Sequence, residues 1–182
     1  MEKELIRDSS HEMIPIYSLG VIQGQTTANV DELSKLLLEN ITKRYSTDPH
    51  ASHFEDSYCP DSPIVDEIVK DMENVYSNYF TGGLSVEHKW GHIHEKNMST
   101  NKHDHPNTSV SGVVYLSVPK GSGYITFYPN PLHDQVYPIL PKKGMFLLFP
   151  AWIPHAVTRN QSNEPRVALS FNFKTKVELG ES

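Results

Sequence analysis

The sequence lacks the features that mark several large classes of protein. Cys59 is the only cysteine among 182 residues, so no intramolecular disulfide can form, which fits a reducing compartment. No apolar run approaches the length of a membrane-spanning helix. The first residues, Met-Glu-Lys-Glu-Leu-Ile-Arg-Asp, lack the basic start and apolar centre of a secretory signal. We therefore expect a cytoplasmic protein with no membrane partner.

Positive charge is also scarce and dispersed. The formal net charge is -6, and Lys142 with Lys143 is the nearest approach to a basic cluster. A nucleic-acid footprint would need a basic patch or stripe, so no nucleic-acid partner is expected. The length fits one domain with a real core, which we expect to span residues 1–182.

Two segments in the first half have the periodicity of amphipathic helices. Residues 30–45 carry one apolar stripe, and Asn29 or Thr27 can cap its start. Ser62 followed by Pro63 predicts the start of a second helix, which Gly82 and Gly83 should end. The expected buried stripes are Val30, Leu33, Leu37 and Ile41 in the first helix, and Ile64, Ile68, Met72, Val75 and Tyr79 in the second. We expect the two helices to pack on the outside of a sheet, as helical support over about residues 1–83.

The second half changes to short strand-like runs separated by Pro, Gly, Asn and Ser. These runs cover residues 84–90, 110–118, 124–128, 145–149, 155–158 and 167–173, and residues 14–22 suggest one or two edge strands. Strands at intervals of about ten residues are typical of a sandwich or jelly roll. The expected fold is therefore mainly β, with a β core over about residues 84–175.

Histidine is abundant, and its spacing suggests a metal site. His103 and His105 lie one residue apart before a valine-rich run, so in a strand both side chains point to one face. Two imidazoles on one face are part of a first-row metal site, and His155 is the candidate third ligand. The alternative is two loop histidines and one buried, hydrogen-bonded histidine.

Two other histidine pairs compete with this assignment. His92 and His94 form a second His-x-His pair that either lines the same cavity or faces solvent. We favour His103 and His105 because that pair runs directly into the apolar segment. His50 and His53 lie three residues apart in a polar stretch, which gives them no common face.

Arg166 opens the last predicted strand, where Ala168, Ser170 and Asn172 share its face. An inward arginine is costly without an anion, because the guanidinium keeps its charge. A carboxylate bound through two hydrogen bonds would compensate that charge. The alternative is a surface arginine at the start of a strand.

The second half also carries four motifs that belong together. They are His-Asp-His-Pro-Asn-Thr-Ser-Val-Ser-Gly-Val-Val-Tyr-Leu at 103–116, Ile-Thr-Phe-Tyr-Pro-Asn-Pro at 125–131, Gly-Met-Phe-Leu-Leu-Phe-Pro-Ala-Trp-Ile-Pro-His-Ala-Val at 144–157, and Arg-Val-Ala-Leu-Ser-Phe-Asn at 166–172. This pattern, over about residues 84–174, resembles the 2-oxoglutarate and iron(II)-dependent dioxygenases, in the branch related to prolyl 4-hydroxylases. The resemblance implies a double-stranded β-helix (jelly-roll) core with the two helices packed outside.

The resemblance also implies roles for individual residues. His103, His105 and His155 would bind iron(II), while Arg166 and Tyr115 would bind the distal carboxylate of 2-oxoglutarate, with Ser170 assisting from the Arg166 face. Two positions depart from the pattern. Position 105 is His where Asp or Glu is usual, and Ala168 stands where Ser or Thr is frequent. Asp104 is no simple replacement, since as the next residue it should face away from His103.

The implied activity is hydroxylation of a small-molecule or peptide substrate, coupled to oxidative decarboxylation of 2-oxoglutarate with dioxygen. Exposed edge strands would permit a homodimer. One competing interpretation is a cupin-type three-histidine enzyme such as a thiol dioxygenase, because Gly144, Pro150, His155 and Asn160 resemble the second cupin motif. Another is a non-catalytic jelly-roll binding module. Bound iron and tight 2-oxoglutarate binding would separate the three.

Overall fold

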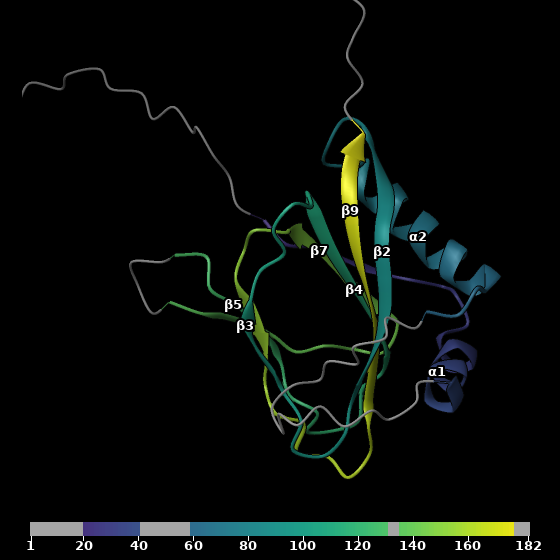
Figure 1. The fold of residues 1–182 in the computed structure, drawn as a ribbon, viewed down its shortest axis with the longest axis vertical. Coiled ribbons are helices and arrows are strands. Elements are labelled where there is room, and N and C mark those ends of the chain that lie inside the picture. The colour runs from purple at the N-terminus through teal and green to yellow at the C-terminus, as the bar shows by residue number, and fades with distance from the viewer. Residues whose placement is uncertain (1–19, 41–58, 131–134, 177–182) are drawn as a thin grey trace, which may run out of the picture.

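The computed structural model describes residues 20–40, 59–130 and 135–176, and is mainly β with two helices (Figure 1). The helices are α1 (Val30–Asn40) and α2 (Pro63–Tyr76). The strands are β1 (Ile22–Gln25), β2 (Gly83–His94), β3 (Thr100–His103), β4 (Val110–Ser117), β5 (Ile125–Phe127), β6 (Tyr137–Ile139), β7 (Met145–Pro150), β8 (His155–Val157) and β9 (Arg166–Lys176). Neither helix is long and apolar enough to span a bilayer, and the described residues contain no other candidate span.

The strands form two antiparallel sheets. The larger sheet has the order β1-β7-β4-β9-β2, and the smaller has the order β3-β8-β5-β6. Both helices contact the larger sheet, α1 at β4 and β9, and α2 at β1, β2 and β7. In Figure 1 they lie on the side of that sheet away from β3 and β5. The molecule is therefore layered as helices, large sheet and small sheet.

Side-chain alternation along the central strands creates a separate core on each face of the large sheet. On β9, Val167, Leu169 and Phe171 join the cluster beneath the helices. Ala168, between them, joins the cluster that lies between the two sheets. The strand β4 divides in the same way, with Val114 toward the helices and Tyr115 toward the small sheet. Both central strands are thus buried on both faces, which accounts for their nearly continuous apolar sequence.

The first helix begins as predicted and is shorter than predicted. It starts at Val30, and the side-chain oxygen of Asn29 accepts a hydrogen bond from the N–H of Glu32 at 3.3 Å. Asn29 is therefore the cap, and Thr27 is not needed in that role. The helix ends at Asn40, while Ile41 and the rest of the predicted segment lie outside the described residues.

The second helix is capped by Ser62, whose hydroxyl accepts from the N–H of Ile64 at 3.3 Å, and Pro63 is its first residue. The predicted buried stripe was partly wrong. Its fully buried residues are Val65, Ile68, Met72 and Tyr76. Ile64 and Val75 pack at the edge of the core, whereas Tyr79 is 68% exposed because the helix has already ended at Tyr76. The stripe is rotated by about one position, which periodicity alone leaves open.

The predicted strands of the second half are present with shifts at their ends. The largest difference is β2, which continues through His92 and His94 because it pairs with β9 along its length. The short strands β3 and β6 were not predicted as separate elements. At the N-terminal end, β1 follows the predicted 14–22 edge segment and is an edge strand of the large sheet, while residues before 20 and the His50/His53 pair lie outside the described residues.

Candidate metal centre

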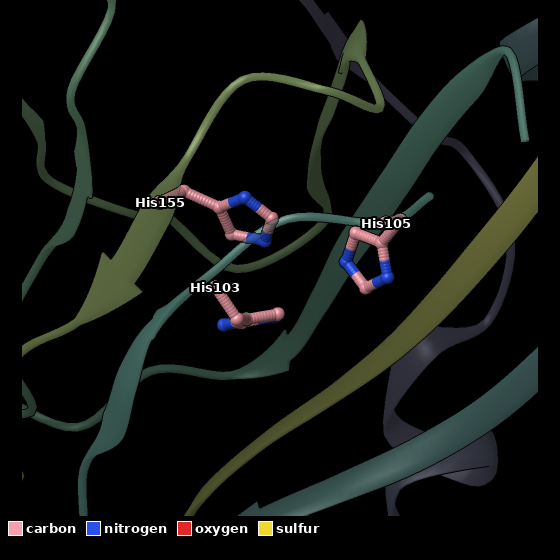
Figure 2. Close-up of side chains that lie close together, drawn as sticks. All are labelled: His103, His105 and His155. Atoms are coloured by element: carbon pink, nitrogen blue, oxygen red, sulfur yellow. The ribbon is translucent and has the colours of Figure 1, made fainter. Parts of the chain in front are cut away.

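Three histidines from two neighbouring segments of the small sheet converge on one point. His103 ends β3 and His155 begins β8, and these two residues are directly paired across the sheet. The ring centroids are 4.3 Å apart for His103 and His155, 5.0 Å for His103 and His105, and 5.2 Å for His105 and His155. One nitrogen from each ring lies within 4.8 Å of the others, close enough to bind a single metal ion. Figure 2 shows the three rings gathered around a common space.

His105 reaches this point although it is not part of a strand. The strand β3 ends at His103, so the same-face argument from strand alternation does not by itself place His105. Its backbone N–H instead donates to the carbonyl oxygen of Ala151 at 2.9 Å, on the segment that leads to His155. This bond continues the pairing of the two segments by one more step and keeps His105 beside the other two rings.

Backbone carbonyl groups set the tautomers of two of these rings. The Nδ1 of His103 lies 2.8 Å from the carbonyl oxygen of Asn101, and the Nδ1 of His155 lies 3.0 Å from that of Ile153. A carbonyl only accepts, so each Nδ1 carries the hydrogen and each Nε2 carries the lone pair. In metal-binding histidines, one ring nitrogen likewise binds the metal while the other donates a hydrogen bond that fixes the ring.

Burial keeps His155 neutral over the physiological range. Desolvation, with smaller contributions from His103 and His105, lowers the pKa of His155 to about 3, while the hydrogen bond to Ile153 acts in the opposite direction. The aromatic rings of Phe149 and Phe127 lie 4.8 Å and 6.1 Å from the His155 ring, and they supply the apolar surroundings. A neutral imidazole is the form that binds a metal ion.

A buried cation lies elsewhere in the same cavity. Arg166, at the start of β9, is 1% exposed, and its Nη1 donates to the carbonyl oxygen of Ser122 at 2.5 Å. Its Nη2 is buried and has no hydrogen-bond partner among the described residues, and the same holds for the hydroxyl of Tyr115. These two buried groups can both donate hydrogen bonds into the cavity, so they suit a ligand whose oxygens accept them.

The charge of Arg166 persists at neutral pH, although no carboxylate among the described residues pairs with it. Burial lowers the pKa of Arg166 to about 10, and Tyr115 partly opposes that shift. Burial raises the pKa of Tyr115 well above its ordinary value, so its hydroxyl stays protonated and can donate. A guanidinium N–H and a phenol O–H beside each other fit one carboxylate group. The residues present therefore fit both a metal ion and an anionic co-ligand.

The second histidine pair lines this cavity as well. On β2 and β9, Trp90 pairs with Ser170, His92 with Ala168, and His94 with Arg166. The cavity lining consists of Trp90, His92, His94, Thr100, His103, His105, Ser111, Gly112, Val113, Tyr115, Ile125, Phe149, His155, Val157, Arg166, Ala168, Ser170 and Phe171. Every predicted site residue is in this set, and so are His92 and His94, so their pair faces the cavity and not bulk solvent.

Two supports of the site were not predicted. The first is the backbone carbonyl of Ser122, in a turn whose sequence signal is Gly121-Ser-Gly123. The second is Asn160, which is fully buried and donates to the carbonyls of His94 and Glu164 at 2.8 Å and 2.9 Å. It also accepts from the N–H of Ser162 at 2.9 Å. Asn160 thereby ties the end of β2 to the loop that leads into Arg166.

Comparison with known proteins decides the family. Residues 88–172 match the model of the family described as "Putative 2OG-Fe(II) oxygenase". The match assigns residues 88–172 to the 2-oxoglutarate/iron(II) oxygenases. The matched region runs from β2 to β9 and contains every predicted site residue. Members of this family are enzymes that use iron(II), 2-oxoglutarate and dioxygen. No curated protein gives a significant match.

Solved structures share the oxygenase fold at low sequence identity. SnoN, a non-heme α-ketoglutarate-dependent epimerase from nogalamycin biosynthesis, aligns with a TM-score of 0.68 and 15% identity over 86% of this chain and 78% of SnoN. A Pseudomonas putida prolyl-4-hydroxylase aligns with a TM-score of 0.56 and 17% identity over 88% and 90%. A Trichoplax adhaerens prolyl hydroxylase in complex with a hypoxia-inducible-factor peptide fragment gives 0.62 and 16% over 87% and 84%. The fold is thus that of the oxygenase jelly rolls.

Proposed function

We propose that this oxygenase hydroxylates a small-molecule or peptide substrate and couples that reaction to the oxidative decarboxylation of 2-oxoglutarate to succinate and carbon dioxide. The observation that carries the proposal is the shared cavity. Three histidine nitrogens within 4.8 Å of one another lie in the same cavity as a buried guanidinium with an unused N–H. A metal site alone fits many enzymes, whereas a metal site with a buried cation fits a chelating diacid.

In this proposal, His103, His105 and His155 bind iron(II) through their inward nitrogens. The Nδ1 atoms of His103 and His155 donate to the carbonyls of Asn101 and Ile153, and these bonds hold the two rings in place before the metal arrives. Bound iron with 2-oxoglutarate would supply the oxidising chemistry. The protein contributes the positions of the ligands and the apolar surface of Phe149 and Phe127, which keeps water from the site.

Arg166 and Tyr115 are proposed to bind the distal carboxylate of 2-oxoglutarate. The Nη2 of Arg166 and the hydroxyl of Tyr115 would each donate to it, and the bond from Nη1 to Ser122 keeps the guanidinium oriented. Ser170 lies four residues beyond Arg166 on the same face of β9 and lines the cavity. We propose that its hydroxyl assists the binding of 2-oxoglutarate from that face. Ala168 has no hydroxyl, which leaves Arg166 and Tyr115 as the donors.

Both substrate classes have parallels among proteins of the same fold. The Trichoplax adhaerens enzyme is in complex with a peptide, and SnoN belongs to the biosynthesis of a small molecule. We also propose that residues 1–182 form a single domain, because β1, from the N-terminal part, is a strand of the same sheet as β9.

Anaerobic titration tests the proposal. Purified protein freed of metal is titrated with iron(II), and the iron complex is then titrated with 2-oxoglutarate while the visible absorption is recorded. The proposal expects one iron per chain and a new absorption band that appears only when both are present. Iron binding without any 2-oxoglutarate binding would instead favour the cupin-type enzyme. Absence of iron binding would favour the non-catalytic module.

Succinate formation identifies the reaction. Under air, the iron-loaded protein should convert 2-oxoglutarate to succinate, and the true substrate should increase the rate. A matched sample without iron should form none.

A further inference from the structure

One wall of the cavity is built by side chains that the proposed function does not use. Trp90 and His92 lie on β2, at the level of Ser170 and Ala168 on β9, and both line the cavity. The Trp90 ring lies 5.9 Å from the ring of His105 and 5.7 Å from that of His92. Arg166 pairs with His94, which lies on β2 two residues beyond His92 and four beyond Trp90. This wall is therefore displaced from the guanidinium, toward His105.

Over residues 20–40, 59–130 and 135–176, no acidic side chain lines this cavity. The described residues that form it include five histidines and one arginine, but no aspartate or glutamate. Carboxylates are also absent from the groups that shift the pKa values of Arg166 and His155. The formal net charge of the whole chain is -6, so the excess of positive charge is a local property of the cavity and not of the protein.

A third histidine in place of the usual carboxylate changes the charge of the loaded site. Metal-bound imidazoles are neutral, so the only negative charges at the loaded site are the two carboxylates of 2-oxoglutarate. Because Arg166 pairs with the distal carboxylate, only the other carboxylate offsets the iron, and the loaded site keeps one net positive charge beside the histidines. An aspartate or glutamate at position 105 would have cancelled it. Burying a net charge is unfavourable, and an anion of opposite sign removes that cost.

We propose that the substrate of this oxygenase carries an anionic oxygen group, a carboxylate or a phosphate, which binds at the wall formed by Trp90 and His92 beside His105. This inference rests on the proposed function and specifies the substrate of that same site. The ring N–H groups of Trp90 and His92 are donors that such a group accepts from. The planar face of Trp90 suits the apolar part of the substrate.

The test compares charged and neutral forms of one small molecule. Protein loaded anaerobically with iron(II) and excess 2-oxoglutarate is titrated with 3-phenylpropionate, with its amide, and with phenyl phosphate. Binding is measured by calorimetry and by the change in the visible absorption of the iron complex. We expect at least one of the two anions to bind about tenfold more tightly than the amide, equivalent to about 1.4 kcal/mol.

Variants locate the effect. His92→Ala should reduce the anion affinity several-fold and leave that of the amide nearly unchanged. His88→Ala is the matched control, because His88 is an exposed histidine on the same strand that does not line the cavity. His92→Gln, which keeps a side-chain N–H donor, should retain more of the anion affinity than His92→Ala.

The outcomes separate this inference from the proposed function. If iron and 2-oxoglutarate do not bind, the proposed function fails, and this inference fails with it. If they bind but the anions bind no better than the amide, or do not bind at all, this inference is overturned and the proposed function stands. A preference for phenyl phosphate over 3-phenylpropionate supports the inference and identifies the anionic group as a phosphate.

Discussion

Arg166 has the most demanding surroundings of the described residues at the site. Its guanidinium is 1% exposed, one of its nitrogens donates to the Ser122 carbonyl, and another has no partner among the described residues. A permanent charge in such a place destabilises the folded protein unless a ligand completes its hydrogen bonds. The cost of this arrangement in the free protein is a reason to assign Arg166 to binding and not to stability.

Replacing Arg166 should separate co-substrate binding from metal binding. Arg166→Ala removes charge-assisted hydrogen bonds worth roughly 1.5–3 kcal/mol, so 2-oxoglutarate affinity should fall roughly ten- to a hundredfold. Iron affinity should change little, because the three histidines lie on other elements. Calorimetric titration of each ligand measures both effects. Arg159→Ala, at an exposed arginine, is the control, and equal 2-oxoglutarate affinities in the two variants would remove Arg166 from the co-substrate site.

His155 should be required for the metal. His155→Ala leaves only two of the three ligands, so stoichiometric iron binding should be lost, as measured by metal analysis after anaerobic loading. Because His155 also packs against Phe149 and Phe127, circular dichroism must show that the variant is folded. His88→Ala should retain full iron binding. A folded His155→Ala protein that binds iron as tightly as the parent would exclude His155 as a ligand.

Cys59 provides a prediction about pH. Burial raises the pKa of its thiol from 9.0 to about 11, with Asp61 and Asp66 adding to the shift and Lys89 opposing it. Only the thiolate is nucleophilic, so at pH 8 the folded protein should react with iodoacetamide roughly a hundredfold more slowly than the urea-unfolded chain. The rate should rise about tenfold per pH unit and level off near pH 11. A plateau near pH 9 would show that the folded environment does not protect the thiol.

At the scale of elements, the backbone turn before β5 decides where the Arg166 side chain is held. Gly121 and Gly123 both have positive φ, +84° and +88°, and between them Ser122 presents its carbonyl oxygen to Arg166. The two glycines differ in their surroundings. A Cβ on Gly123 would lie 2.5 Å from the hydroxyl of Thr158, whereas a Cβ on Gly121 would meet nothing within 4 Å.

These two glycines form a matched pair for mutation. Both Gly121→Ala and Gly123→Ala should lose about 1–2 kcal/mol of unfolding free energy from the left-handed backbone. Gly123→Ala should lose more, because it also meets Thr158 and the backbone oxygen of Arg159. It should also weaken 2-oxoglutarate binding, because the turn that holds Arg166 must shift. Chemical denaturation and calorimetry check the two effects, and equal losses in both variants would contradict the crowding argument.

Some helices and strands could be predicted from their local sequence, and others could not. The helix starts at Val30 and Pro63 follow from local capping signals, and the apolar strands β4, β7 and β9 from their composition. The short strand β3 is polar and exists because it pairs with β8, a partner more than fifty residues away. That pairing also brings His103 to His155. Local sequence could therefore identify the three histidines as candidates, but whether they lie together depends on long-range strand pairing. The contact of Arg166 with Ser122 could not be predicted, because it uses a backbone carbonyl that any residue has.

At the scale of the whole molecule, the large sheet has one core on each face, and the core between the sheets supplies most of the apolar lining of the site. Leu147 and Leu148 are neighbours on β7, and their exposed fractions are 0% and 1%. Leu148 belongs to the core beneath the helices, and Leu147 to the core between the sheets. The two residues are alike in size and burial but differ in which face they support.

This pair predicts a difference between stability and function. Leu147→Ala and Leu148→Ala should each destabilise the fold by about 2–5 kcal/mol, measured by chemical denaturation. Only Leu147→Ala should also weaken iron and 2-oxoglutarate binding in the folded protein, because its cavity opens beside Tyr115 and Ile153 in the same cluster. A similar loss of ligand affinity in Leu148→Ala would mean that both faces control the site.

The two halves of the candidate site belong to different layers of the molecule. The histidines come from the small sheet and the segment that follows β3, whereas Arg166 and Tyr115 come from the large sheet. The spacing of the two sheets therefore fixes the distance between the three histidines and the guanidinium. With the roles proposed for these residues, we expect a keto diacid one methylene shorter or longer than 2-oxoglutarate to reach only one of the two groups at a time, so the apolar packing between the layers should select the co-substrate by its length.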